Sequence, residues 1–156
     1  MSKRKYARDD YEAYFGMLGV LGTRWEIAVG HPGYRNSTGW HLLTKLWRQG
    51  PTKMADAYAF LTEIKSADKK RKLVEGAIKD ELIECSDAML VRKIRGKLQE
   101  GENPEPRRGK VSPDIWLSSE MNERIDIFLD EVIDELIKTA ASIKARLRAT
   151  RQPAAK

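Results

Sequence analysis

Several kinds of residue are scarce in this sequence, and each scarcity excludes a class of protein. The single cysteine, Cys85, rules out an internal disulfide and fits a reducing compartment. Neither of the two histidines, His31 and His41, has a second histidine or a cysteine at metal-ligand spacing, so we expect no metal and no cofactor. No apolar run approaches the roughly 20 residues that cross a bilayer. Because no apolar segment follows the basic N-terminus either, we expect a cytoplasmic protein with no membrane partner.

Catalytic groupings are also absent from the sequence. It contains no glycine-rich phosphate-binding loop and no Ser/His/Asp arrangement. The carboxylates near the C-terminus have basic and apolar neighbours at helical spacing, which is typical of a solvated helix face and not of an acid–base pair. Lysines and arginines near Cys85 would favour its thiolate and a redox role, and a buried strand cysteine is the alternative. We therefore expect no catalytic residues and no enzyme activity.

The 156 residues do contain an excess of positive charge and a strong helical periodicity. The net charge of +6 favours a nucleic acid or another anionic surface as partner. Residues 81–84 and 111–117 are predicted to be short strands. The expected fold class is therefore mainly α with a small β wing, an α+β fold. Apolar residues at steps of three and four predict helices over residues 10–29, 38–49, 52–61, 66–79 and 118–150.

Polar residues predict where these helices begin, and a row of glycines predicts a close approach to the first helix. Thr38 is the predicted N-cap of the second helix, Ser66 of the fourth, and Ser118 or Ser119 of the last. The first helix contains three glycines spaced three residues apart, and each costs about 1 kcal/mol of helix stability relative to alanine. Such a row indicates that another backbone or a ligand comes close to this helix. The three glycines are Gly16, Gly19 and Gly22.

The last predicted helix carries the longest apolar stripe. At ~1.5 Å per residue it extends over ~40 Å, which is more than the rest of a small domain can cover. Its charges are acidic in the first half and basic in the second, an order that complements the helix dipole. A second chain is the natural cover, so we predict a homodimer held by the first and last helices. The stripe consists of Ile125, Leu129, Val132, Leu136, Ala140, Ile143 and Leu147.

Residues 52–78 have the pattern of a helix-turn-helix, in which a short turn joins two helices. The second of them would turn an apolar side inward and a basic side outward. Such a helix could enter the major groove of double-stranded DNA, with its first residues near base edges and its lysines near phosphates. A solvated helix with exposed lysines is the alternative. The inward residues are Leu73, Val74, Ala77 and Ile78, and the outward ones are Asp68, Lys69, Lys72, Gly76 and Lys79.

In its order of elements, nearly the whole chain resembles the multiple antibiotic resistance regulator (MarR) family. Residues 103–110 are similar to the family's wing tip, and Trp116-Leu117-Ser118 is similar to the strand that returns into the last helix. The other matching parts are residues 42–46, the run from Gly50-Pro51 to Ala57, the helix led by Ser66, the pair Leu73-Val74, and Glu81-Leu82-Ile83-Glu84.

The resemblance implies a winged helix-turn-helix fold with N- and C-terminal dimerisation helices. It also implies a dimeric, sequence-specific transcription regulator that binds double-stranded DNA, with repression as the expected mode and a small aromatic or acyl molecule as its effector. A helical protein-interaction module with a vestigial winged-helix fold is the alternative function. The implied DNA-binding residues are Lys65, Ser66, Asp68, Lys69, Lys72, Lys79, Arg107, Arg108 and Lys110.

Three departures from the family's pattern bear on these expectations. Glu81 stands where the family usually has glycine. Lys70 falls on the inward side of the fourth helix, so either its side chain extends outward or the predicted register is off by one. Segment 86–102 looks like an insertion or an extended wing, because about twenty residues separate Glu84 from the arginines of the tip. This segment could follow the DNA backbone, and a solvated amphipathic segment is the alternative. Its basic residues are Arg92, Lys93, Arg95 and Lys97.

Four aromatic residues in the first two predicted helices could line a pocket for the effector. Effectors of the family often bind between the dimerisation helices and the DNA-binding lobe, and ordinary core packing is the alternative. The four residues are Tyr14, Trp25, Trp40 and Trp47.

The predicted organisation has five parts. These are a basic arm (1–9), a dimerisation helix and loop (10–37), a DNA-binding lobe with an extended wing (38–117), a second dimerisation helix (118–150) and a tail (151–156).

Overall fold

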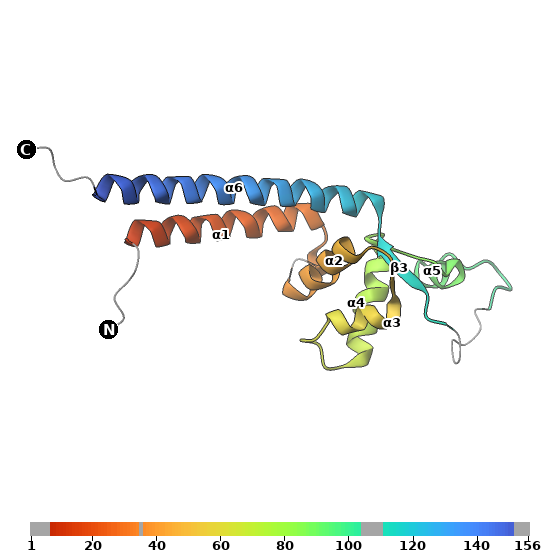
Figure 1. Ribbon diagram of the computed structural model, residues 1–156. Coiled ribbons are helices and arrows are strands. Elements are labelled where there is room, and N and C mark those ends of the chain that lie inside the picture. Colours follow the sequence, from red (N-terminus) through yellow and green to blue (C-terminus); the bar gives the residue numbers. More distant parts are fainter. Residues whose placement is uncertain (1–6, 35, 104–110, 152–156) are drawn as a thin grey trace, which may run out of the picture. The chain divides into compact units, whose positions relative to one another are not determined.

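The computed structural model describes residues 7–34, 36–103 and 111–151 (Figure 1). It is mainly helical, with one small three-stranded antiparallel sheet, as expected for an α+β fold. The chain forms two compact units, one from residues 1–30 and 126–156 and the other from residues 31–125. Their boundaries fall at Gly30 and Ile125, so the start of the last helix belongs to the second unit. In the described part of the chain, no helix combines the length and the apolarity needed to cross a membrane.

The first unit is a helical hairpin of α1 (Arg8–Val29) and the part of α6 (Ser119–Arg151) that follows Ile125. The two helices lie side by side and antiparallel (Figure 1). At one end, the buried Asp10 carboxylate pairs with Arg146 at 3.2 Å. Toward the other end, Arg24 pairs with Glu131 at 3.1 Å. These ion pairs fix which levels of the two helices face each other.

The second unit, which we call the lobe, has helices around a small sheet. Strand β3 lies in the centre of the sheet, between β1 and β2, and is antiparallel to both. In register, Thr52 and Cys85 flank Ile115 from its two sides. The elements of the lobe are η1 (Pro32–Tyr34), α2 (Ser37–Gln49), β1 (Thr52–Lys53), α3 (Met54–Ala57), η2 (Tyr58–Phe60), α4 (Ala67–Lys79), β2 (Ile83–Cys85), α5 (Ala88–Ile94) and β3 (Asp114–Leu117).

The core of the lobe is built from side chains that solvent does not reach. It draws them from α2, the turn before α4, α4 itself, the sheet and the first two turns of α6. Complete burial of a leucine or isoleucine stabilises the folded state by about 1.5–3 kcal/mol relative to leaving it exposed. The largest of these side chains are Leu42, Leu43, Leu46, Leu61, Val74, Ile78, Ile83, Ile115, Met121 and Ile125.

Two of the predicted helix caps are confirmed and one is wrong. The hydroxyl of Ser66 accepts the amide of Lys69, and that of Ser118 accepts the amide of Met121 at 3.2 Å. The prediction of Thr38 as the cap of α2 is wrong, because Asn36 caps this helix by accepting the Gly39 amide at 2.9 Å. The first four amides of a helix have no helical acceptor, and an asparagine side chain satisfies one of them as well as threonine does.

The helix predicted over residues 52–61 is confirmed only in part, because a two-residue strand and two short helical elements occupy this range. Thr52 and Lys53 pair with β3, and the Met54 amide donates to the carbonyl of Pro113 at 2.8 Å. A partner about sixty residues away therefore takes the backbone groups that a helix would have used. Only Met54–Ala57 remains α-helical, and η2 continues the same direction as a tighter turn.

Candidate nucleic-acid interface

Helix α4 is fixed in the lobe by one buried side and one long lysine. Val74, Ala77 and Ile78 are completely buried. The Lys70 ammonium donates to the backbone carbonyl of Tyr58 at 3.1 Å, and the side chain is half-buried. Lys70 therefore ties α4 to η2, the element that precedes it. The predicted helix register is correct, and the inward lysine is satisfied by a carbonyl at the edge of the core.

The other side of α4 is exposed and mostly cationic. All six residues that sequence reasoning assigned to DNA from the turn and this helix are exposed, and helical spacing puts those on α4 on one side of the helix. This surface is the candidate interface, and Ser66 takes part in it as the cap. Its members are Lys65, Ser66, Asp68, Lys69, Lys72 and Lys79.

Asp68 organises the cations at the start of α4. Its carboxylate lies 2.8 Å from the Lys72 ammonium and 2.5 Å from the Arg71 guanidinium. These hydrogen bonds, from Lys72 first and then Arg71, lower the pKa of Asp68. Arg71 was missed by sequence reasoning, although its position three residues after Asp68 puts the two side chains in reach on a helix. The aspartate thus holds two cations in place near the first turn.

Gly76 does not belong to this exposed surface, contrary to prediction. The Tyr34 hydroxyl donates to the carbonyl of Leu73 at 2.9 Å and lies against Gly76. A Cβ at position 76 would come within 2.6 Å of that hydroxyl oxygen. Burial raises the pKa of the Tyr34 phenol. The glycine therefore serves to admit a tyrosine from η1, which fixes α4 from a second direction.

Segment 86–102 is a packed element and not an extended wing. Helix α5 packs on α4 and β2, with Asp87 as its N-cap. The mostly buried Arg95 donates to the carbonyl of Ile78 at 3.0 Å, at the end of α4, and pairs with Glu84. Arg92 pairs with Glu102 at 3.2 Å. Two of the four basic residues therefore hold the segment together, while Lys93 and Lys97 remain exposed.

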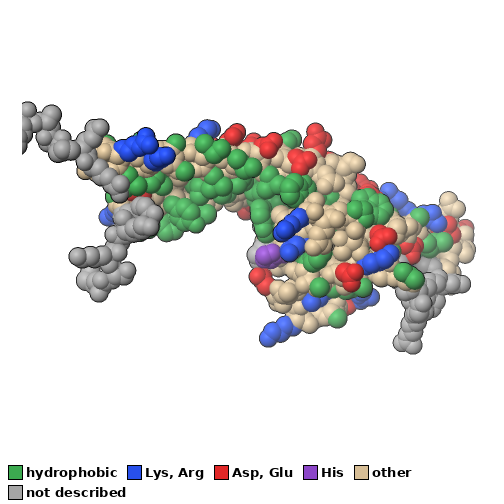
Figure 2. Space-filling model, viewed as in Figure 1, with side chains coloured by type: hydrophobic (Ala, Val, Ile, Leu, Met, Phe, Trp, Pro, Cys, Tyr) green, Lys and Arg blue, Asp and Glu red, His purple; other side chains and the backbone are tan. Residues whose placement is uncertain are grey.

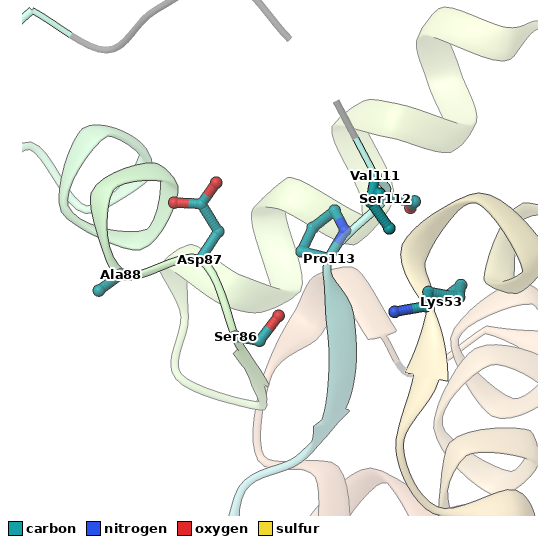
Figure 3. A pocket seen from close by; sticks show the side chains of 7 residues that line it. All are labelled: Lys53, Ser86, Asp87, Ala88, Val111, Ser112 and Pro113. Atoms are coloured by element: carbon teal, nitrogen blue, oxygen red, sulfur yellow. The ribbon is translucent and has the colours of Figure 1, made fainter. Parts of the chain in front are cut away.

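The predicted wing contacts Arg107, Arg108 and Lys110 lie outside the described residues. Residues 86–88 and 111–113, together with Lys53, border a cavity of about 470 Å³ (Figure 3). Its hydroxyl groups serve the fold, since Ser86 accepts the Asp114 amide at 2.9 Å and Ser112 accepts the Ala55 amide at 3.0 Å. The residues around the cavity are Lys53, Ser86, Asp87, Ala88, Val111, Ser112 and Pro113.

The four aromatic residues predicted to line an effector pocket are divided between the two units. Tyr14 and Trp25 lie on α1, eleven residues or about 16 Å apart. Trp25 is buried, with its ring centroid 5.3 Å from that of Phe128. Trp40 and Trp47 lie on α2 in the lobe. Tyr14 borders a groove between α1 and α6.

The remaining reactive side chains, Cys85 and the two histidines, take part in the packing or in ion pairs of the fold. Cys85 is buried in β2, as expected for a strand cysteine. His31 lies 3.1 Å from Asp80, and His41 lies 3.9 Å from Glu63. Among the residues that the structure describes, no three histidine, cysteine or acidic side chains form a group able to hold a metal ion.

Comparison with known proteins gives no match: no family model, no curated protein and no solved structure is significantly similar to this chain.

Proposed function

We propose that this protein is a sequence-specific, double-stranded DNA-binding transcription regulator that acts as a homodimer, with α4 as its recognition helix. The observation that carries the proposal is the candidate interface on α4. This face of α4 is exposed and cationic. The opposite side of the helix is buried in the core of the lobe, and its first turn is capped by Ser66 and ion-paired through Asp68.

The geometry of α4 suits insertion into a major groove. A groove about 12 Å wide admits one helix, provided that the helix stands clear of its own domain on one side. The lysines on that side can reach phosphates, and the first turn can approach base edges. Asp68 would repel phosphates if it were alone, but its pairs with Arg71 and Lys72 compensate its charge. The order of α3, η2 and α4, followed by two strands, supports a winged helix-turn-helix.

The homodimer is supported by the hairpin of α1 and α6. Several large apolar side chains of this hairpin are exposed, which is unusual for a surface without a partner. Two linked lobes would present two copies of α4 and read a pseudo-palindromic site with half-sites about one helical turn apart. We infer repression as the mode of action, since occupancy of a promoter by such a dimer excludes other proteins. A small aromatic or acyl effector remains part of the proposal.

The test begins with selection of binding sites from random DNA by the purified full-length protein. Affinity for the selected site is then measured at several salt concentrations. Each lost phosphate contact should reduce the slope of log K against log salt by about 0.9. Lys69→Ala should therefore weaken binding and flatten the slope. Lys138→Ala, which removes the same charge from an exposed position on α6, is the matched control and should keep the parent's slope.

Base reading is tested separately from phosphate binding. If Lys72 contacts a base, Lys72→Ala should relax the preference at one position of each half-site, at a cost of about 1–3 kcal/mol. If Lys72→Glu and Lys69→Glu both bind the selected site as tightly as the parent, α4 is not the recognition helix. A chain that selects no site and shows no salt-dependent DNA binding would favour the alternative, a helical protein-interaction module.

A further inference from the structure

A second apolar stripe runs along α6 beside the one that packs on α1. The side chains that face α1 include Phe128 and Glu135, which contact Trp25 and Arg24. The second stripe lies roughly a quarter turn further round the helix and follows heptad steps of four and three. Its members Ile133 and Leu136 are exposed, in line with Figure 2, where hydrophobic side chains gather along the hairpin. The stripe consists of Leu129, Ile133, Leu136, Ala140, Ile143 and Leu147.

Helix α1 adds its own apolar side chains to the same face. A groove of about 590 Å³ runs between the two helices near the free end of the hairpin. Phe15 is 68% exposed beside it, although a phenylalanine of a monomer is normally covered. The groove and the second stripe thus form one apolar surface. Its walls include Tyr11, Tyr14 and Phe15 of α1 and Ala140, Ile143 and Leu147 of α6.

Charges along the outer edge of the second stripe identify what fits this surface. Asp126 and Asp130 come 11 and 7 residues before Ile137, and Arg148 and Lys144 come 11 and 7 residues after it. Ile137 itself is exposed. The edge is therefore acidic at one end, apolar in the middle and basic at the other. A copy of the same helix in the opposite direction would bring each acidic residue opposite a basic one.

Helix α1 gives an independent indication of the same symmetry. The pairs Asp10–Arg146 and Arg24–Glu131 place Leu18 and Gly19 at the level of Ile137. A twofold axis at this level brings Leu18 of one copy to Gly19 of the other. It also brings the exposed Phe15 to Gly22. A Cβ at Gly19 or at Gly22 would meet nothing within 4 Å in this chain, so there is room for the large side chains of another copy.

We propose that the groove and second stripe bind the hairpin of a second copy of this chain, with the two α6 helices antiparallel and crossing at Ile137. Asp130 of each copy then faces Lys144 of the other, and Asp126 faces Arg148. Phe15 of each copy packs on Gly22 of the other. This arrangement deepens the proposed homodimer and rests on it, but it does not depend on DNA binding.

Charge reversal tests the direction of the pairing, with the full-length protein in sedimentation equilibrium at low salt. Asp130→Lys and Lys144→Asp each replace two attractive contacts per dimer with two repulsive ones. Each should raise the dimer dissociation constant about ten-fold or more. The double variant Asp130→Lys/Lys144→Asp restores both pairs in an antiparallel dimer and should return to within about two-fold of the parent. Circular dichroism checks that α6 stays helical.

Substitution of glycines tests the fit of α1. Gly22→Gln fills the space assigned to Phe15 and should weaken the dimer. Gly16→Gln makes the same change on the same helix. Gly16 lies on a different side of α1 from Leu18 and Gly22, so this variant should not weaken the dimer. Both replacements raise helix propensity to a similar extent, so a difference between them reports the interface and not the helix.

The outcomes separate this inference from the proposed function. A parent that stays monomeric at ten micromolar overturns the inference and the homodimer together, whether a small ligand or another protein then occupies the groove. A dimeric parent whose single charge variants are as tight as itself overturns the antiparallel pairing alone. Failure to bind DNA by a dimer that responds as expected overturns the proposed regulator and leaves the pairing intact.

Discussion

The lobe buries most of its large apolar side chains, whereas the hairpin leaves many of its own exposed to solvent. Among the described residues, ten of the eleven largest fully buried side chains belong to the lobe, and Val29 alone to the hairpin. Nine of the eleven large hydrophobic side chains that are exposed belong to the hairpin, and only Trp47 and Val111 to the lobe. The lobe therefore has a core of its own, whereas the hairpin has one seam and a bare apolar face.

This difference shows where each unit obtains its stability. Two helices can bury only the stripes that face each other, and an amphipathic helix with a wider apolar side needs a third element. Helices, sheet and loops surround the lobe's core on all sides. We therefore expect the lobe to respond to substitution in the same way at any protein concentration, and the hairpin to respond in a concentration-dependent way.

Truncation of the lobe's core should have the largest effect. Leu43 on α2 is completely buried, and Leu43→Ala should lower the free energy of unfolding by about 2–5 kcal/mol through lost burial and the cavity left behind. Urea unfolding at two protein concentrations measures it. The loss should be the same at both. If it changes with concentration, the lobe depends on a partner and the contrast between the units fails.

A charge on the hairpin's bare face should have the next largest effect. Leu136→Glu places two carboxylates in the proposed dimer interface, and the dimer dissociation constant should rise at least a hundred-fold, about 2.7 kcal/mol. Ile127→Glu is the control, because Ile127 is similarly exposed but lies nine residues away, on the opposite side of α6. Sedimentation compares the two variants. Equal dissociation constants would show that the exposed face is not an interface.

A smaller effect should come from the contact of Tyr34 with Gly76. Gly76→Ala alone brings a Cβ against the tyrosine hydroxyl, and this clash offsets the gain in helix propensity. In the Tyr34→Phe background the hydroxyl is gone, and the next ring atom lies at 3.9 Å, an ordinary contact. The double variant should therefore be more stable than the two single changes predict by about 1–2 kcal/mol. Additive effects would mean that the hydroxyl and the glycine are not in contact.

Features with local causes could be predicted from the sequence. The caps at Ser66 and Ser118, the buried side of α4 and the long stripe of α6 all depend on residues a few positions apart. The exposed lysines of α4 follow from the same periodicity. These features include most of the candidate interface.

Features with distant causes could not be predicted. The helix expected over residues 52–61 starts two residues late because β3, some sixty residues later, pairs with Thr52 and Lys53. Gly76 lies at a position that periodicity assigns to solvent, but Tyr34 from η1 covers it. Arg95 was grouped with the cations of a wing, although its guanidinium binds the end of α4. In each case a tertiary contact decides the role of the residue.

The smallest effect concerns Glu81 at the end of α4, a position where the family that the sequence resembles usually has glycine. The amide of Leu82 donates to the Ala77 carbonyl at 3.0 Å and that of Glu81 to Ile78 at 3.2 Å, which is a Schellman motif. Glu81 has a φ of 61°, and this left-handed conformation costs a residue with a Cβ about 1–2 kcal/mol. Glu81→Gly should remove that strain, and after the entropy that glycine loses on folding the lobe should gain up to about 1 kcal/mol in urea unfolding. Glu81→Ala is the control, since it removes the same exposed carboxylate but keeps the Cβ, and it should give no gain. If the alanine and glycine variants are equally stable, the backbone at this position is not strained, and the departure from glycine costs the fold nothing.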